Sequence, residues 1–110
     1  MTLRRNKYNA KKTMVDGHLF DSQKEAKRYF ELKCLQAAGE VWKLELQPKF
    51  DLMVNGVKVG TYIADFRYET NDGKVIVEDV KSPVTKTPVY NLKKKILATY
   101  KPPVVITEII

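Results

Sequence analysis

Residues 75–82, "VIVEDVKS", join an apolar run to two acids and a lysine. The β-branched residues that open this stretch predict a buried strand. Because side chains alternate between the two faces of a strand, Asp79 and Lys81 share one face with Val77, and Glu78 lies on the other. The stretch therefore predicts a strand that ends with a carboxylate and an ammonium group side by side.

Another acid interrupts the preceding predicted strand, in "YIADF" at residues 62–66. The short turn at residues 70–73, "TNDG", predicts that the two strands pair, which would place Asp65 nearly opposite Asp79. Two carboxylates so close repel each other unless positive charge lies between them. Lys81 could supply part of that charge, and Mg²⁺ could supply it better, because two carboxylates and a substrate phosphate suffice to bind it. The alternative is an ordinary cross-strand salt bridge on a half-exposed face.

The clearest helix is predicted over residues 21–40, "DSQKEAKRYFELKCLQAAGE". Asp21 or Ser22 would cap it, and Gly39 would end it. Glu25 allows two interpretations that are compatible. Ser22-x-x-Glu25 has the spacing of a capping box, and the helical period also places Glu25 on the face that should meet the sheet. A carboxylate on a core-facing stripe is costly unless it is paired or binds a metal, so Glu25 is a candidate third acid of the site.

The remaining pattern predicts an α+β domain with a mixed sheet flanked by two helices. Asp16-Gly17 and Asn55-Gly56 are hairpin signals, and Pro48 interrupts the first long strand. The order of the core is α-β-β-β-α-β. Its elements are the first helix, strands over residues 41–54, 57–70 and 74–82, a second helix over residues 90–100 and a last strand over residues 104–110.

The chain has 110 residues, a net charge of +7 and a size typical of one domain. We expect a flexible basic arm over residues 1–12 and a single domain over residues 13–110. Charge alone fits both polyanion binding and a solvated surface. The basic residues of the arm, followed by two lysines of the second helix, are the candidate nucleic-acid-binding residues: Arg4, Arg5, Lys7, Lys11, Lys12, Lys93 and Lys94.

Several classes are excluded or disfavoured by composition. There is no apolar run of about 18 residues, so no membrane span is expected. One Cys and one His exclude a zinc site of the usual Cys/His type, and the lone Cys34 fits a reducing, cytoplasmic setting. Trp42 and Phe50 are expected in the core rather than as base-stacking platforms.

Two polar residues have accessory roles to weigh. Gln47, in "LELQPKF", could orient a water or a phosphate, or could simply bond to the broken strand edge beside Pro48. Tyr90, at the start of the second predicted helix, could contact phosphates.

These motifs resemble the PD-(D/E)xK nuclease superfamily over most of the chain. The segments "KYNAKKT", "FDSQKEAKRY", "LELQPKF", "YIADFRY" and "VEDVKS" are most similar to a small phage-encoded family without an assigned activity. The helical glutamate is similar to that of phage junction-resolving endonucleases. The chain departs from the superfamily pattern in having Ala64 where a proline often precedes the first acid, and Asp79 where Glu is more frequent.

The resemblance implies a restriction-endonuclease-like fold and a set of site residues. Asp65 and Asp79 would bind Mg²⁺, for which Mn²⁺ could substitute, with Glu25 and the carbonyl of Val80 as further ligands, and Lys81 would be catalytic. The implied activity is Mg²⁺-dependent DNA endonuclease, selective for branched DNA such as a Holliday junction, in phage recombination or replication. It would act in the cytoplasm of the bacterial host, and cutting two strands would need a homodimer. The alternatives are a non-catalytic nucleic-acid-binding module and an endonuclease subunit that requires a partner protein.

Overall fold

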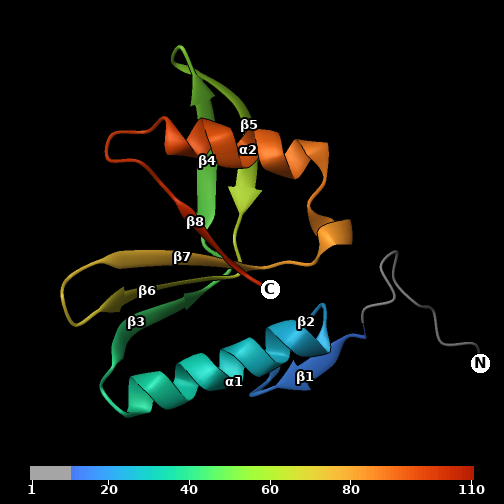
Figure 1. Ribbon diagram of the computed structural model, residues 1–110, viewed down its shortest axis with the longest axis vertical. Coiled ribbons are helices and arrows are strands. Elements are labelled where there is room, and N and C mark those ends of the chain that lie inside the picture. Colours follow the sequence, from blue (N-terminus) through green and yellow to red (C-terminus); the bar gives the residue numbers. More distant parts are fainter. Residues whose placement is uncertain (1–10) are drawn as a thin grey trace, which may run out of the picture.

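A computed structural model describes residues 11–110 of the chain. Its central sheet contains β3 (Val41–Leu46), β6 (Phe66–Thr70), β7 (Val75–Val80) and β8 (Ile106–Ile109), in the order β3-β6-β7-β8. Neighbouring strands are antiparallel except β7 and β8, which are parallel. The sheet is therefore mixed, and the expected α+β class is confirmed (Figure 1).

The two helices cover opposite faces of this sheet (Figure 1). Helix α1 (Gln23–Ala37) and helix α2 (Pro88–Ala98) each contact a separate apolar cluster. The α1 cluster includes Tyr29, Leu32, Phe66 and Tyr68, and the α2 cluster includes Tyr62, Val77, Tyr90, Leu97 and Ile106. Phe66 and Tyr68 of β6 belong to the α1 cluster, and β7 alternates: Val77 belongs to the α2 cluster, whereas Ile76 packs against the α1 cluster.

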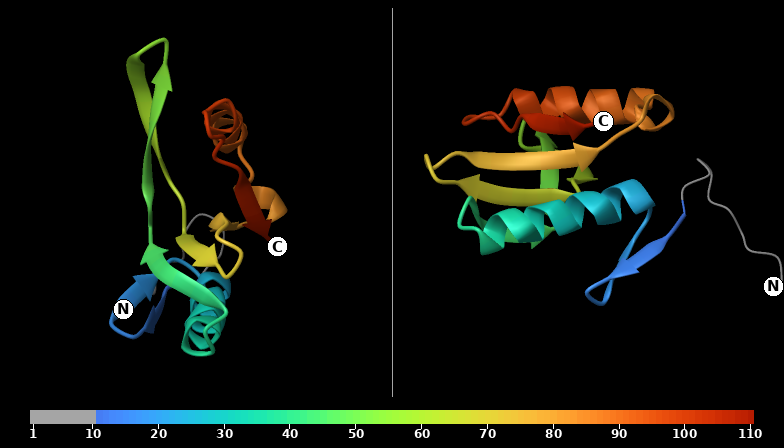
Figure 2. Two further views of the ribbon diagram at one scale, coloured as in Figure 1. Left: turned by 90° about the vertical axis from the view of Figure 1, so that its left-hand side faces the viewer. Right: turned by 60° about the horizontal axis from the view of Figure 1, so that its bottom comes forward.

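A bend divides the long hairpin that the sequence predicted. Residues beyond the bend form a separate two-stranded sheet, β4 (Lys49–Val54) and β5 (Val57–Ile63), which crosses the direction of the central strands (Figure 2). The interruption that Pro48 predicted within residues 41–54 is confirmed, whereas the prediction of one continuous strand over residues 57–70 was wrong. Gln47 adopts a positive φ of 51°, and Pro48 lacks a backbone N–H, so the ladder cannot continue straight.

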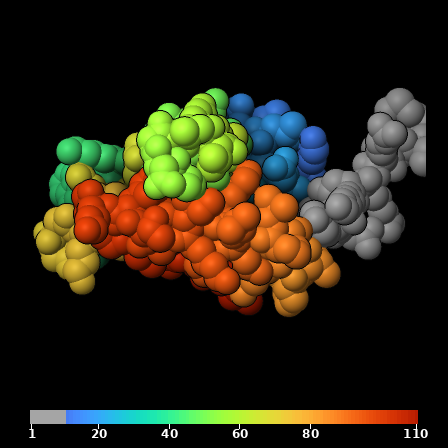
Figure 3. All heavy atoms as spheres, turned by 90° about the horizontal axis from the view of Figure 1, so that it is seen from above, coloured from blue at the N-terminus to red at the C-terminus, as the bar shows by residue number. Residues whose placement is uncertain are grey.

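The β4–β5 sheet packs against the second helix. Figure 3 shows the green hairpin and the orange helix side by side on one face of the molecule. Leu52 of β4 and Tyr62 of β5 are buried in the α2 cluster. The bend thus lets one hairpin serve two layers, because its near half joins the central sheet and its far half covers α2.

Short turns follow the predicted chemistry. Strands β1 (Thr13–Val15) and β2 (His18–Phe20) pair across Asp16-Gly17, whose φ angles are 51° and 77°. Positive φ at both central residues is the requirement of a type I′ turn. Asn55-Gly56 repeats the pattern between β4 and β5. The Phe20 ring then packs on Tyr29 of α1, with 5.0 Å between ring centroids.

Two smaller expectations need correction. Helix α2 begins at Pro88 rather than at Tyr90, because the Thr87 side chain accepts a hydrogen bond from the Tyr90 N–H and Pro suits the first helical turn. Trp42 is 53% exposed and donates a hydrogen bond to Asn71, so it is not a core residue. Phe50 packs against the α2 cluster, as expected. Among residues 11–110, no helix is long and apolar enough to cross a membrane.

Candidate functional site

Two carboxylates face each other where β6 and β7 leave the sheet. The register pairs Phe66 with Glu78, so Asp65 lies opposite Asp79, as the sequence predicted. Asp79 Oδ1 accepts a hydrogen bond from the Asp65 N–H at 3.1 Å, and Asp65 Oδ2 accepts one from the Val80 N–H at 2.8 Å. These reciprocal bonds hold the two side chains in place at the end of the strand pair.

Glu25, from the first turn of α1, completes the group of acids. Its side chain is buried, and its backbone N–H donates to Ser22 Oγ at 3.1 Å, which caps the helix. The carboxyl itself hydrogen-bonds to the Asp65 carboxyl rather than serving only the cap. Burial, followed by the charges of Asp65, Asp21 and Asp79, raises the pKa of Glu25 to about 8. At neutral pH Glu25 therefore retains a proton that it can donate to Asp65.

The pKa values of both aspartates are also raised above their ordinary values. Burial raises the pKa of Asp79 to about 6, against the opposing effect of the Lys81 charge. Burial raises the pKa of Asp65 as well, while the Val80 N–H and Lys81 lower it. Asp79 Oδ2 is buried and has no hydrogen-bond partner within the described residues. Such an atom is costly in a folded protein unless a cation or a donor approaches it.

Lys81 is positioned by an aromatic ring. Its Nζ lies 4.2 Å from the centroid of Tyr90, a favourable cation–π distance. Tyr90 is buried, and its hydroxyl donates to Glu108 Oε2 at 2.7 Å. Glu108 also pairs with Lys86 at 3.1 Å and Lys94 at 3.4 Å, and its pKa is lowered to about 2, chiefly by the Tyr90 hydroxyl. Tyr90 thus contributes to the site through its ring, which contacts the Lys81 ammonium group.

Glu78 precedes Asp79 in β7 and faces the opposite side of the sheet. Glu78 is 1% exposed and points to α1, where its carboxylate accepts from Arg28 Nε at 2.8 Å and Nη2 at 2.6 Å. The Tyr68 hydroxyl donates to the same carboxylate, and burial raises the pKa of Tyr68 to about 12. The expectation that Glu78 lies on the opposite face from Asp79 is confirmed. Arg28 follows Glu25 by one helical turn, so this ion pair fixes α1 next to the acids.

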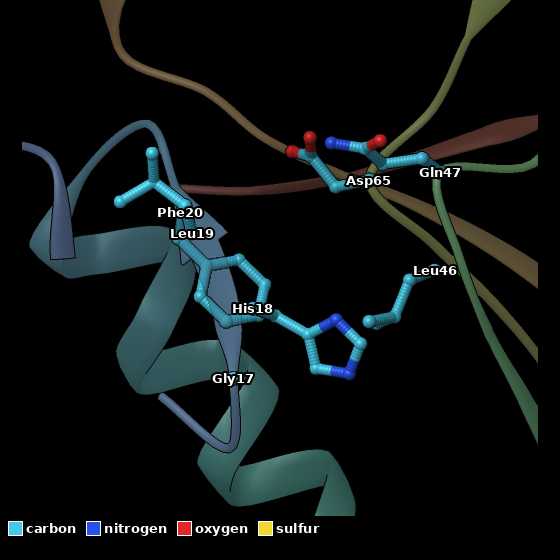
Figure 4. A pocket seen from close by; sticks show the side chains of 7 residues that line it. All are labelled: Gly17, His18, Leu19, Phe20, Leu46, Gln47 and Asp65. Atoms are coloured by element: carbon cyan, nitrogen blue, oxygen red, sulfur yellow. The ribbon is translucent and has the colours of Figure 1, made fainter. Parts of the chain in front are cut away.

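Gln47 lies beside the acids without bonding to them through its side chain. Its backbone N–H donates to the Asp65 carbonyl at 2.9 Å, which is the strand-edge role that the sequence allowed. Its amide and the Asp65 carboxylate line a pocket of about 240 Å³ together with His18 and Leu46 (Figure 4). The contact of Gln47 with a water or a phosphate stays a prediction.

The basic residues are placed in different ways. Lys93 Nζ donates to the Thr61 carbonyl of β5 at 3.0 Å, and Lys94 pairs with Glu108. Both lysines are thus bound to the protein itself as well as partly exposed. Lys11 and Lys12 are exposed, whereas Arg4, Arg5 and Lys7 lie outside the described residues.

Sequence reasoning missed several neighbours of the acids. Lys24 Nζ donates to the Lys81 carbonyl at 3.1 Å, and Glu108 anchors Tyr90. The one acid in the apolar final strand, at Glu108, was a signal that could have been used. The approach of Lys24 and of His18 depends on tertiary packing that no local pattern encodes.

A family model described as "Protein of unknown function (DUF1064)" matches residues 5–109. The chain belongs to the DUF1064 family. The matched range includes both helices, all four strands of the central sheet and every acid described above. No curated protein and no solved structure matches the chain.

The donor set of this DUF1064 protein is chemically suited to a hard divalent cation. Asp65 and Asp79 offer carboxylate oxygens, and the buried unpartnered Oδ2 of Asp79 is the atom that a cation would satisfy. As the side chains lie, no three His, Cys, Asp or Glu residues between positions 11 and 110 are grouped so that they could hold a metal. Two carboxylates completed by backbone oxygen, water and substrate phosphate are what this site could provide, with Glu25 joining after it loses its proton.

Proposed function

We propose that this protein is a Mg²⁺-dependent DNA endonuclease with a restriction-endonuclease-like fold, a relative of the PD-(D/E)xK nucleases. The observation that supports this most directly is the geometry at the end of β6 and β7. There, Asp65 and Asp79 are fixed by backbone N–H groups, one carboxylate oxygen has no partner, and a lysine ammonium lies alongside. Buried acids whose pKa values are raised and that have a specific cation beside them are candidates for a functional site.

The chemistry would divide among these residues. Asp65 and Asp79 would hold Mg²⁺ or Mn²⁺, with the Val80 carbonyl and Glu25 as further ligands, and the bound ion would supply Lewis-acid activation of the phosphate and of water. Lys81 places a positive charge beside them, which would stabilise charge developing on the phosphate or orient the attacking water. Tyr90 holds that ammonium group in place.

The charge of the molecule supports a nucleic acid as the substrate. The net charge is +7, and Lys24 and Lys86 lie near the acids in addition to the lysines that the sequence analysis named. Phosphate backbones bind such surfaces through counterion release. One site cuts one strand, so a homodimer is proposed for paired cuts, as on branched DNA or a Holliday junction in phage recombination or replication. The proposed setting is the cytoplasm of the bacterial host.

The decisive experiment is a cleavage assay on four-way, flap, single-stranded and duplex DNA with Mg²⁺, Mn²⁺ or EDTA. We expect metal-dependent nicking that Asp79→Ala and Lys81→Ala each reduce at least about 100-fold, because each removes charge from the reacting centre. DNA binding by these variants should persist. Asp72→Ala and Lys74→Ala are matched controls in the exposed β6–β7 turn, and their cleavage should equal that of the wild type. Unchanged cleavage by Asp79→Ala would refute the site.

One observation favours a second function, that of a DNA-binding module or of a subunit that a partner protein activates. The Glu25 carboxyl hydrogen-bonds to Asp65, and the acids within residues 11–110 do not form a preassembled group of three metal ligands. A partner or the DNA itself would then have to open the cluster. DNA binding without cleavage in either metal would support this alternative and exclude an autonomous nuclease.

A further inference from the structure

A pocket opens beside the acids, between the β1–β2 hairpin and the bend that precedes β4. Its volume is about 240 Å³. Figure 4 shows the Gln47 amide next to the Asp65 carboxylate, with the His18 ring nearer Leu46. The residues that matter for its chemistry are His18, Leu19, Phe20, Leu46, Gln47 and Asp65.

Two polar side chains in this pocket are available to a ligand. Within residues 11–110, neither the Gln47 amide nor the His18 imidazole hydrogen-bonds to another residue. The His18 ring packs edge-on against Tyr29, with centroids 5.8 Å apart, which fixes its plane. Gln47 is a non-glycine residue at φ 51°, outside any two-residue hairpin turn. A positive φ strains the backbone of a non-glycine residue, and strained residues concentrate at active sites and ligand-binding sites.

The charge of the pocket selects the kind of ligand. Asp65 is the one ionisable acid that lines it, so without a bound cation its charge disfavours an anionic group such as a phosphate in the interior of the pocket. Apolar walls from Phe20 and Leu46, a flat imidazole and one amide instead suit an uncharged planar group with a polar edge. A nucleobase has these properties, since it stacks on aromatic rings and bonds along its edge to amides.

The location of the pocket connects such a base to the acids. Asp65 contributes to both, because its carboxylate lines the pocket and also bonds to the Val80 N–H and to Glu25. A base held here and a phosphate held at Asp79 could therefore belong to neighbouring positions of one strand.

We propose that this pocket binds one unpaired nucleobase of the DNA strand to be cut, stacked on His18 and read along its edge by Gln47. The proposal rests on the proposed nuclease function and names the class of its substrate. A base enters such a pocket only when it is out of the duplex stack. The protein would therefore select single-stranded, flap or junction DNA over continuous duplex.

The test uses DNA binding in EDTA, so that cleavage plays no part. Single-stranded and flap DNA are compared with the same strands carrying one abasic position, moved along the strand in successive probes. We expect one position at which loss of the base weakens binding about 10-fold, as stacking on an aromatic ring predicts. Gln47→Gly and His18→Ala should reduce this difference to less than about 2-fold. Gln47→Gly is chosen because glycine suits a positive φ, so the fold should persist.

Asn55→Gly is the matched control. It also replaces an amide at positive φ, here 50°, but at the tip of the β4–β5 hairpin, and it should retain the full difference between intact and abasic DNA. Equal binding of intact and abasic probes by the wild type, or an undiminished difference in Gln47→Gly, would overturn the pocket proposal. Metal-dependent cleavage would then still uphold the nuclease. Base-dependent binding without cleavage would instead uphold the pocket and overturn the nuclease.

Discussion

At the scale of single residues, the acids of the site store a proton. The Glu25 carboxyl bonds to Asp65, and its pKa is about 8 because of burial and neighbouring acids. A divalent cation would have to displace this proton, since metal ligands must be deprotonated. A proton and the proposed cation would therefore compete for one location, and the stability of the protein should respond to pH.

This exchange gives a prediction for stability against pH without metal. The ordinary pKa of Glu25 is 4.5, so between pH 4.5 and about 8 the unfolded chain ionises while the folded chain keeps the proton. The free energy of unfolding should therefore fall as pH rises through this range, because each unit of difference between the folded and unfolded pKa corresponds to about 1.4 kcal/mol. Asp79, with a pKa near 6, adds to the fall below that pH. Urea unfolding of Glu25→Gln should show a flatter profile.

Glu31→Gln is the control for this experiment, because Glu31 is an exposed acid on the same helix. Its profile should match that of the wild type. A wild-type stability that rises steadily from pH 5 to pH 8 in EDTA would contradict the environment described for Glu25.

Local sequence patterns predicted much of the site at this scale. The hairpin turn at residues 70–73 placed Asp79 opposite Asp65, and the helical period placed Glu25 towards the sheet, as the structure confirms. The Lys81–Tyr90 contact was not predicted, because it joins a strand end to a helix 9 positions later through the loop between them. Distances across such a loop depend on packing rather than on local preference.

At the scale of elements, the buried ion pair Arg28–Glu78 joins α1 to the sheet in addition to the α1 cluster. Arg28 and Glu78 are 20% and 1% exposed, and the carboxylate also accepts from Tyr68. Arg28→Met should lower the free energy of unfolding by about 3 kcal/mol, because the buried carboxylate loses its cation. Adding Glu78→Gln to Arg28→Met should recover part of the loss, since an uncharged amide costs less to bury. Denaturant titration measures both effects.

The pair Arg67–Glu45 is the matched comparison. It joins β6 to β3 but is 37% and 46% exposed, so Arg67→Met should cost less than about 1 kcal/mol. Equal losses from the two arginine substitutions would show that burial of Glu78 does not set the cost.

Element boundaries were harder to predict than element types. Both helices, the hairpin turns and the strands of the central sheet follow local signals, whereas the bend at Gln47 and Pro48 divides two predicted strands at once. Pro48 signalled the first break. The second, before Asp65, had no signal of its own, because it follows from the pairing of Gln47 and Pro48 with residues 64 and 65 across the hairpin.

At the scale of the whole molecule, charge is divided unequally along the chain. Residues 1–12 contain five basic residues and no acid. Deleting them should weaken DNA binding and reduce the magnitude of the slope of log affinity against log salt by up to about 4.5, since each phosphate contact contributes about 0.9. Affinities measured from 50 to 200 mM salt give this slope.

A length-matched control separates charge from chain length. Replacing Arg4, Arg5, Lys7, Lys11 and Lys12 with Gln should reproduce the effect of the deletion. A salt slope identical to that of the full chain in either variant would show that the arm does not contact phosphate.

The neighbouring residues Glu78 and Asp79 have a consequence for folding fidelity. One anchors α1 through Arg28, and the next faces Asp65 on the other side of the sheet. A shift of β7 by one position would exchange the two carboxylates between faces and leave Arg28 and the Asp65 N–H without their partners. One register of β7 therefore sets both the ion pair that anchors α1 and the position of Asp79 beside Asp65. Transplanting the site into another scaffold would require moving this dipeptide with the partners on both faces.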